Sequence, residues 1–311
     1  MDKQRTTIAG TRGSLLALHQ TDWVMERLKE HYPEIRISKM IIKTQGDKIL
    51  DVPLAKIGDK GLFVKELETA LLEKEIDFAV HSMKDVPTEI PSSLTIGAIP
   101  RRESPQDAFI SPGFRSLEDL PKGARVGTSS LRRKAQILHM RPDLEIEDLR
   151  GNLDTRLRKL DEGQYDAIIL ASAGLRRLGL EGRIRQLIPV EISLPAVGQG
   201  ALAVEIRRDD RELSGLLQVL HDPETALSVE AERSFLTRLE GGCQVPLGAL
   251  ARIVGGKLTL DGVIVSLDGK ELCRDRVEGP SYEAASLGIK LAEMLLSHGG
   301  AGILEEIRGV V

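Results

Sequence analysis

Two kinds of hydrophobic patterning divide the chain. Up to about residue 220, short apolar runs alternate with segments in which apolar positions recur every three or four residues. The second pattern predicts helices over residues 14–31, from Gly61 onward, over 130–140 and over 152–160. The short runs predict strands over 35–43, 77–80, 107–111, 125–127, 144–149, 165–171 and 202–206. Such alternation is typical of parallel or mixed sheets that helices cover on both faces.

The pattern changes in the last ninety residues. Gly255-Gly256 and Asp268-Gly269 are typical hairpin turns. They separate three strand-like runs, at residues 249–254, 258–267 and 270–277. One helical face follows, formed by Ala284, Leu287, Leu291, Met294 and Leu295. The sequence therefore predicts a small α+β domain, in which a three-strand antiparallel sheet packs on a helix.

The strand predicted at 202–206 comes after the second α/β segment. A chain that crosses from one α/β domain to another and returns has two hinge strands, and its ligand binds in the cleft between the domains. We therefore expect three domains. Domain 1 comprises residues 1–100 and 200–220, domain 2 comprises 101–199, and domain 3 comprises 221–311.

The charge distribution points to a small anionic ligand. The chain has 43 basic and 47 acidic residues, a net charge of −4 that argues against a nucleic-acid partner. Residues 101–211 hold 17 Arg, 3 Lys and 17 acids, so that third is near +3 and the rest near −7. Arginine pairs two-pronged with carboxylates and phosphates. Salt bridges with those 17 acids remain the alternative.

Several function classes are disfavoured. Two cysteines are too few for a disulfide framework or a cysteine-based zinc site, and the six histidines are scattered, so no metal is expected. The first residues lack a signal-peptide run, and no apolar stretch approaches the roughly 20 residues of a membrane span, so we expect a cytoplasmic protein. Residues 198–203 match a dinucleotide fingerprint but precede a strand. Aromatic residues, at 3%, are too few for base stacking.

Four predicted strand-to-helix turns combine glycine, hydroxyl and arginine residues. Free N–H groups and guanidinium groups at a helix N-terminus bind anions. Hydroxyl groups also cap ordinary helices, but four such turns in an α/β chain favour anion binding. The turns are Gly10–Ser14, Val126–Arg133, Leu149–Asn152 with Arg156, and Ala171–Arg177.

Two further residues allow a chemical role. Asp85 follows a buried strand in the segment His81–Pro87 and could stabilise a developing cation, although an Asx-turn before Pro87 is the more ordinary explanation. Cys243 stands between glycines and a proline, as expected of an accessible loop thiol, although a lone cysteine more often fills a core. Cys273, inside a strand run, is the better candidate for packing.

Together these segments resemble the porphobilinogen deaminase (hydroxymethylbilane synthase) family over essentially the whole chain. The resemblance is carried by Thr11–Ser14 with Gln20, Pro53–Glu68, His81–Pro87, Val126–Arg133, Arg150–Asn152, Leu194–Gly200 and Arg238–Pro246. It implies a monomer with two domains like those of periplasmic binding proteins, a central cleft and a third small domain. It also implies a dipyrromethane cofactor joined by a thioether to Cys243. The family deaminates four porphobilinogens in turn, adds each to the cofactor's free end and releases hydroxymethylbilane by hydrolysis.

The resemblance also assigns roles to individual residues. Asp85 is the catalytic carboxylate, which stabilises the cationic azafulvene left when ammonia departs. Cofactor binding is implied for Cys243, Ser82, Lys84, Asp85, Thr128, Ser130, Arg132, Arg133, Arg150 and Arg156. Substrate binding is implied for Arg12, Gln20, Arg150, Arg156, Arg177 and Gln199. A loop over the cleft is implied for Lys56, Lys60 and Phe63. A non-catalytic two-lobed anion-binding or effector-binding protein is the alternative, but it gives no reason for a loop cysteine at 243.

Overall fold

The computed structural model describes residues 6–48, 61–240 and 245–310. Their contacts divide them into two units, each described by itself. Unit 1 holds residues up to 103 together with 201–226, and unit 2 holds 104–200 and the residues from Leu227 on. None of the helices in these three segments combines the length and the apolar character that a membrane crossing requires.

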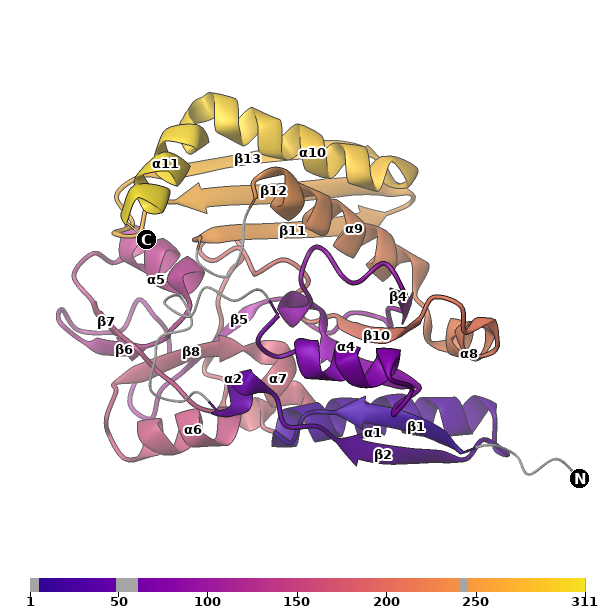
Figure 1. The fold of residues 1–311 in the computed structure, drawn as a ribbon. Coiled ribbons are helices and arrows are strands. Elements are labelled where there is room, and N and C mark those ends of the chain that lie inside the picture. Colours follow the sequence, from indigo (N-terminus) through magenta and orange to yellow (C-terminus); the bar gives the residue numbers. More distant parts are fainter. Residues whose placement is uncertain (1–5, 49–60, 241–244, 311) are drawn as a thin grey trace, which may run out of the picture. The chain divides into compact units, whose positions relative to one another are not determined.

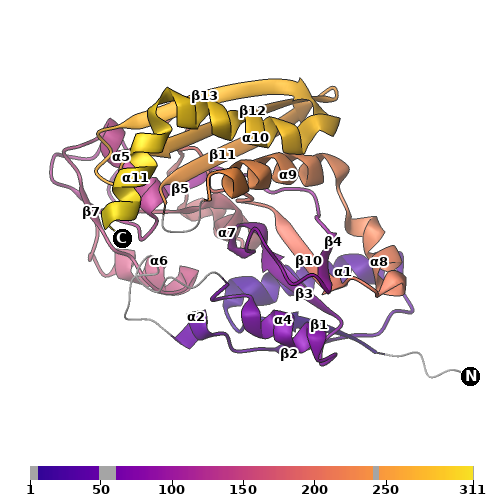
Figure 2. The ribbon, with the colours of Figure 1, turned by 45° about the horizontal axis from the view of Figure 1, so that its top comes forward.

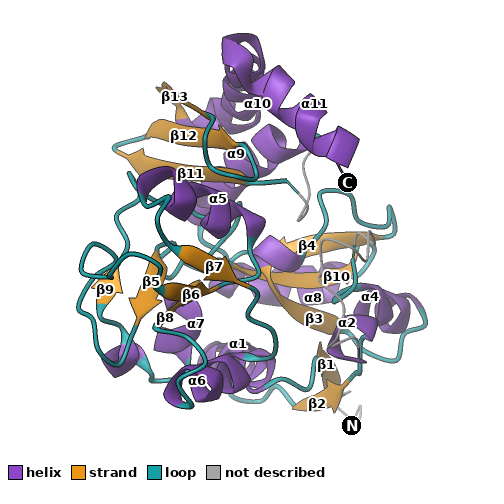
Figure 3. Ribbon diagram, turned by 90° about the vertical axis from the view of Figure 1, so that its left-hand side faces the viewer, coloured by secondary structure: helices purple, strands orange, loops and turns teal. Residues whose placement is uncertain are grey.

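Unit 1 is built on a five-stranded sheet of order β2-β1-β3-β10-β4, of which Figure 1 labels β1, β2, β10 and β4, and Figure 3 all five strands. Strand β1 runs parallel to both β2 and β3, whereas β10 runs antiparallel to β3 and β4. The strands are β1 (Thr7–Thr11), β2 (Ile37–Ile41), β3 (Phe78–Ser82), β4 (Leu94–Ala98) and β10 (Leu202–Arg207). The helices are α1 (Leu15–His31), α2 (Gln45–Lys48), α4 (Lys65–Leu72) and α8 (Arg211–Leu217), with 3₁₀ turns at Met83–Asp85 and Gln218–Leu220.

Alternating side chains of this sheet supply two cores. Phe78 and Val80 of β3 pack with residues of α1 and α8. Ala79, between them, packs with Leu67 and Leu71 of α4. Successive strand residues point to opposite faces, so α4 covers one face of the sheet, and α1 and α8 cover the other.

Unit 2 contains a second sheet of the same pattern, of order β7-β6-β8-β5-β9 (Figure 3). Strand β6 runs parallel to β7 and β8, and β5 runs antiparallel to β8 and β9. The strands are β5 (Asp107–Ile110), β6 (Arg125–Gly127), β7 (Glu145–Glu147), β8 (Ala167–Ala171) and β9 (Gln186–Leu187). The helices are α5 (Leu131–Met140), α6 (Leu153–Asp161) and α7 (Ser172–Arg177), with a 3₁₀ turn at Glu181–Arg183.

The third sheet is the antiparallel meander β11-β12-β13 of unit 2. It is formed by β11 (Leu247–Val254), β12 (Lys257–Val265) and β13 (Leu272–Pro280). The helices of this part are α9 (Pro223–Arg238), α10 (Ala284–Leu295) and α11 (Ala301–Val310), with a 3₁₀ turn at Ser281–Glu283 and a kink at Leu296–Gly300. Helices α9 and α10 lie along the same sheet (Figure 2).

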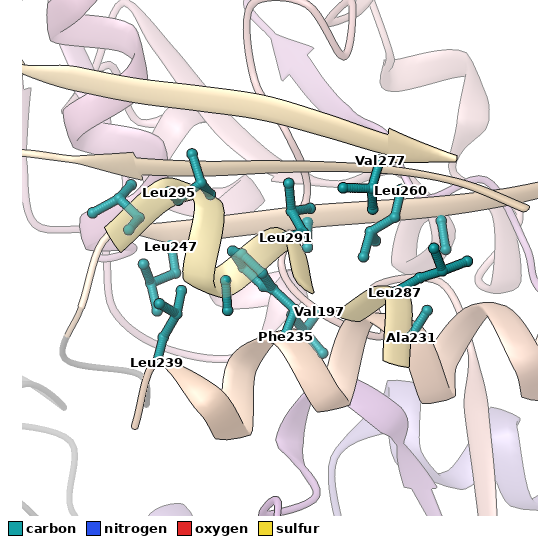
Figure 4. Close-up of a cluster of buried hydrophobic side chains, with 14 of the residues drawn as sticks. Val197, Ala231, Phe235, Leu239, Leu247, Leu260, Val277, Leu287, Leu291 and Leu295 are labelled. Carbon is teal, nitrogen blue, oxygen red and sulfur yellow. The ribbon is translucent and has the colours of Figure 1, made fainter. Parts of the chain in front are cut away.

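Alternation along β12 explains how helices cover both faces of the meander. Leu258, Leu260 and Ile264 join a large core with α9, α10 and α11. Figure 4 shows part of this core, in which Leu260 of β12, Phe235 of α9 and Leu291 of α10 are labelled. Val263 and Val265 face the other way and pack with α5, which lies on the opposite side of the sheet from α10 (Figure 3). These three sheets confirm the predicted fold class, two mixed α/β sheets and a small α+β part.

Candidate functional site

A small pocket of about 70 Å³ opens in unit 1. Strands β1 and β3 are parallel neighbours, so their carboxyl ends meet at one edge of the sheet, where α/β proteins place ligands. Arg12 and Ser14 follow β1, and Ser14 caps α1 by accepting a hydrogen bond from the N–H of Ala17. Ser82 ends β3, and Asp85 ends the single turn after it. The lining residues are Arg12, Ser14, Leu16, Ala17, Gln20, Phe63, Val64, Val80, His81, Ser82 and Asp85.

Arg12 is the cation of this pocket. One of its Nη atoms lies 2.5 Å from a carboxylate oxygen of Asp47, and its guanidinium lies 4.1 Å from the ring centre of Phe63. Burial acts to raise the pKa of Asp47, but the hydrogen bonds and charge of Arg12, with hydrogen bonds from Thr44, hold it below the usual value. An arginine expected to bind a ligand carboxylate therefore already pairs with one of the chain's own.

Gln20 and Ser82 form a second polar wall of the same pocket. The amide nitrogen of Gln20, a residue only 3% exposed, donates to the hydroxyl of Ser82 over 3.0 Å. Asp85 is half-buried and lines the pocket beside them. Lys84 belongs to the same turn and is also half-buried. The pocket thus brings together the arginine, the amide, the hydroxyl and the carboxylate that the sequence predicted.

Unit 2 holds a buried charge cluster centred on Asp107, which we call the Asp107 cluster. The carboxylate of Asp107, the first residue of β5, is fully buried and lies 2.8 Å from an Nη atom of Arg132 and 2.8 Å from one of Arg133. Ser193 donates its hydroxyl to the same carboxylate over 2.9 Å, and Gln199 donates its amide over 3.0 Å. Four side chains thus converge on one carboxylate. The sequence predicted Arg132, Arg133 and Gln199 as site residues, but not Ser193.

The two arginines of this cluster also bind backbone carbonyls. Arg132 donates to the carbonyl of Leu194 over 2.6 Å, and Arg133 donates to that of Ile169 over 3.1 Å. Burial acts to raise the pKa of Asp107, but the charges of Arg132 and Arg133 lower it well below the usual value. Burial lowers the pKa of Arg133. One carboxylate facing two guanidinium groups leaves this part of the core positively charged.

The remaining predicted residues of unit 2 lie at the strand-to-helix turns. Thr128 follows β6 and accepts from the N–H of Ser130, which caps α5. The Nε of Arg156, in α6, donates to the carbonyl of Gly151 over 2.8 Å. Arg177, at the end of α7, donates to the carbonyl of Gly200 over 2.6 Å. Arg150 lies in the loop between β7 and α6.

Some predicted residues cannot be placed, and some residues of the site were missed. Cys243, Lys56 and Lys60 lie outside the described residues. Asp47 and Asp107, which bind the predicted arginines, were not found from the sequence. The one signal for Asp107 is an acidic residue at the start of a buried strand, which needs a cationic partner. Within the described segments, no group of three histidine, cysteine or acidic residues could hold a metal ion.

Comparisons with known proteins agree on one family. Residues 7–215 match the family described as "Porphobilinogen deaminase, dipyromethane cofactor binding domain", and residues 226–297 match "Porphobilinogen deaminase, C-terminal domain". A porphobilinogen deaminase of Carboxydothermus hydrogenoformans is 56% identical over 306 residues, which cover 98% of each chain. One of Desulforudis audaxviator is 55% identical over 305 residues, covering 98% of this chain and 99% of the relative.

Solved structures include more distant neighbours. The crystal structure of the methionine-binding protein MetQ aligns with 71% of this chain and 92% of its own, at 13% identity and a TM-score of 0.45. A likeness of this size says nothing about ligands.

Proposed function

Since the chain belongs to the porphobilinogen deaminase family, we propose how its residues carry out the family's reaction. The protein is a transferase of tetrapyrrole biosynthesis with a dipyrromethane cofactor. It deaminates porphobilinogen, joins four molecules of it head to tail on the cofactor, and releases hydroxymethylbilane. A non-catalytic anion-binding protein is not favoured, because relatives named as the enzyme match the chain over 98% of its length.

The polar groups of unit 2 fit a ligand that carries many carboxylates. Each pyrrole ring of the cofactor bears an acetate and a propionate, and unit 2 offers hydroxyl groups and guanidinium groups at its strand-to-helix turns. In addition, the buried Nε of Arg132 has no hydrogen-bond partner among the described residues. A buried donor left unmatched is costly, and the guanidinium of Arg132 keeps one donor that Asp107 and the backbone carbonyls do not use. We assign the cofactor's carboxylates to Thr128, Ser130, Arg132, Arg133, Arg150 and Arg156, with Ser82 and Lys84 from unit 1.

The unit 1 pocket supports the assignment of the reacting group. Arg12 and Asp85 place opposite charges on the lining of one pocket, and this single observation carries the proposal. Arg12, with Gln20, would bind a carboxylate of the substrate, and Arg177 and Gln199 would bind others. Loss of ammonia leaves positive charge on the substrate's pyrrole, and a carboxylate nearby lowers that barrier by charge stabilisation. We therefore assign Asp85 as the catalytic residue.

We also propose that the cofactor is joined by a thioether to Cys243. The other cysteine, Cys273, is a poor nucleophile, because burial raises the pKa of its thiol and the thiol contacts the carbonyls of Leu295 and His298. The bound cofactor supplies the pyrrole carbon to which the first substrate is joined.

Intact mass tests this assignment. The wild-type protein and the matched control Cys273→Ser, made in a host that produces porphobilinogen, should exceed the 34.1 kDa polypeptide by two pyrrole rings. Cys243→Ser should have the mass of the bare polypeptide. A wild-type protein without added mass would refute the cofactor assignment, and added mass on Cys243→Ser would refute the anchor.

Four further expectations complete the proposal. The protein would act as a monomer in the cytoplasm and would bind no nucleic acid. The boundaries of three domains, at 1–100 with 200–220, 101–199 and 221–311, remain part of the proposal. They are supported by the three separate sheets.

A further inference from the structure

A buried group of titratable residues lies on the α4 face of the unit 1 sheet. In β10, Val204 and Ile206 pack toward α1 and α8, so Glu205, between them, points to the face that α4 covers. His81 of β3 points to the same face, because Ala79, two residues earlier, packs against α4. A glutamate and a histidine therefore lie on one covered face of two neighbouring strands.

The contacts within this group are incomplete. The Nε2 of His81 lies 3.0 Å from a carboxylate oxygen of Glu205, and both side chains are at most 3% exposed. The second oxygen of Glu205 and one oxygen of Glu68, on α4, are buried without a hydrogen-bond partner among the described residues. We call His81, Glu205 and Glu68 the buried acidic cluster. The fully buried Glu205 and the half-buried Glu68 cannot both carry a charge cheaply.

The charges around Glu68 come from three elements. Burial is the largest cause that raises the pKa of Glu68, and the charge of Glu205 on β10 raises it further. His81 on β3 and Lys65 on α4 act in the opposite direction without cancelling the effect. Glu68 therefore takes up a proton at a higher pH than an ordinary glutamate does.

The cluster also lies next to the pocket that holds Asp85, the proposed catalytic residue, because His81 lines the same pocket. We propose that His81, Glu205 and Glu68 form one positioning group, which fixes the imidazole in the pocket wall and sets the pH dependence of turnover. This inference rests on the proposed function. The ionised cluster adds negative charge beside a pocket in which positive charge develops on the substrate. A proton taken up by the cluster removes part of that stabilisation.

The test is the pH profile of kcat for the cofactor-loaded protein and for Glu205→Gln. In the wild type, kcat should fall on the acid side as the cluster takes up its proton. Without the charge of Glu205, the pKa of Glu68 falls toward its ordinary value, so the acid limb should move to lower pH. KM should change little, because the substrate's carboxylates bind elsewhere. Glu68→Gln should shift the acid limb of the kcat profile in the same direction. Because Glu68 is half-buried, this variant replaces Glu205→Gln in the test if Glu205→Gln does not fold.

Asp77→Asn is the matched control. Asp77 is also buried, directly before β3, where it pairs with Arg207 over 2.9 Å, but it does not line the pocket. It should lower stability and leave the pH profile in place. If the kcat profiles of Glu205→Gln and Glu68→Gln are not shifted, or if Asp77→Asn shifts by the same amount, this inference is wrong. Either result would leave the proposed function intact. A wild type that carries the cofactor's mass but turns over no porphobilinogen would overturn the proposed function and this inference with it.

Discussion

The Asp107 cluster should be the most sensitive electrostatic feature of unit 2. Asp107→Asn keeps the shape of the side chain but removes its charge, which leaves Arg132 and Arg133 facing each other in the core. Both arginines are only 5% exposed, so water cannot replace the lost carboxylate. Removing one partner of a buried ion pair costs about 3–5 kcal/mol. We expect a loss in that range in the free energy of unfolding.

Urea unfolding followed by far-UV circular dichroism measures this loss. Asp161→Asn is the control, because Asp161 pairs with Arg183 on the surface of the same unit, where such pairs contribute about 0–1 kcal/mol. The single tryptophan, Trp23, lies in α1 of unit 1 and reports on that unit separately. Its fluorescence midpoint should move less than the circular dichroism midpoint.

The pH dependence of the difference in unfolding free energy between wild type and Asp107→Asn gives a second check. The pKa of Asp107 is lowered in the folded protein, so its stabilising effect is complete above the ordinary aspartate pKa of about 3.9. It is lost only as the pH falls through the lower folded value. The gap between wild type and Asp107→Asn should therefore stay constant from about pH 5 to 8. A loss no larger than that of Asp161→Asn, or a gap that closes near neutral pH, would refute the reasoning.

Three further predictions follow from the pocket and from the helix packing. Asp85→Asn should lower kcat roughly 10²- to 10³-fold with the cofactor's mass retained, and near-normal turnover in a steady-state assay would contradict its role. Asp47→Asn should lower KM, because Arg12 no longer has to break its ion pair with Asp47 before it binds substrate. A partly exposed ion pair contributes a free energy that corresponds to about a 1.5- to 5-fold change in KM. A raised KM would mean that Asp47 positions Arg12. Gly288→Ala should cost about 1–3 kcal/mol on thermal unfolding, since its Cβ would lie 2.2 Å from a carbonyl oxygen of α9. Gly302→Ala, with open space around its Cβ, should gain about 0.4–1 kcal/mol instead.

Local patterns predicted the elements and most of the turns that carry candidate residues. Ser14 and Ser130 cap α1 and α5, as their positions before apolar helical faces indicated. Strand β10 was found at 202–206, and the structure extends it by one residue, to Arg207. Helix α8 and strand β4 were not predicted, because short elements leave few periodic positions to recognise.

The partners of the charged residues could not be predicted, because they lie far apart in the sequence. Asp107 meets Arg132 across 25 residues and Gln199 across 92, and no local pattern marks such pairs. The arginine excess of residues 101–211 also has more than one cause. Arg183 pairs with Asp161 and Arg141 with Asp143, so the salt bridges that the sequence left open account for part of it.

The position of β10 has a consequence for how the protein is made. This strand, residues 202–207, lies between β3 and β4, and no pairing joins β3 to β4 directly. A ribosome has therefore synthesised all of β5 to β9 before the first sheet can close. Until then β3 has an open edge, the kind of surface on which unfinished chains aggregate. The amino-terminal unit is begun first and completed late, and a chain truncated before residue 202 would never complete it.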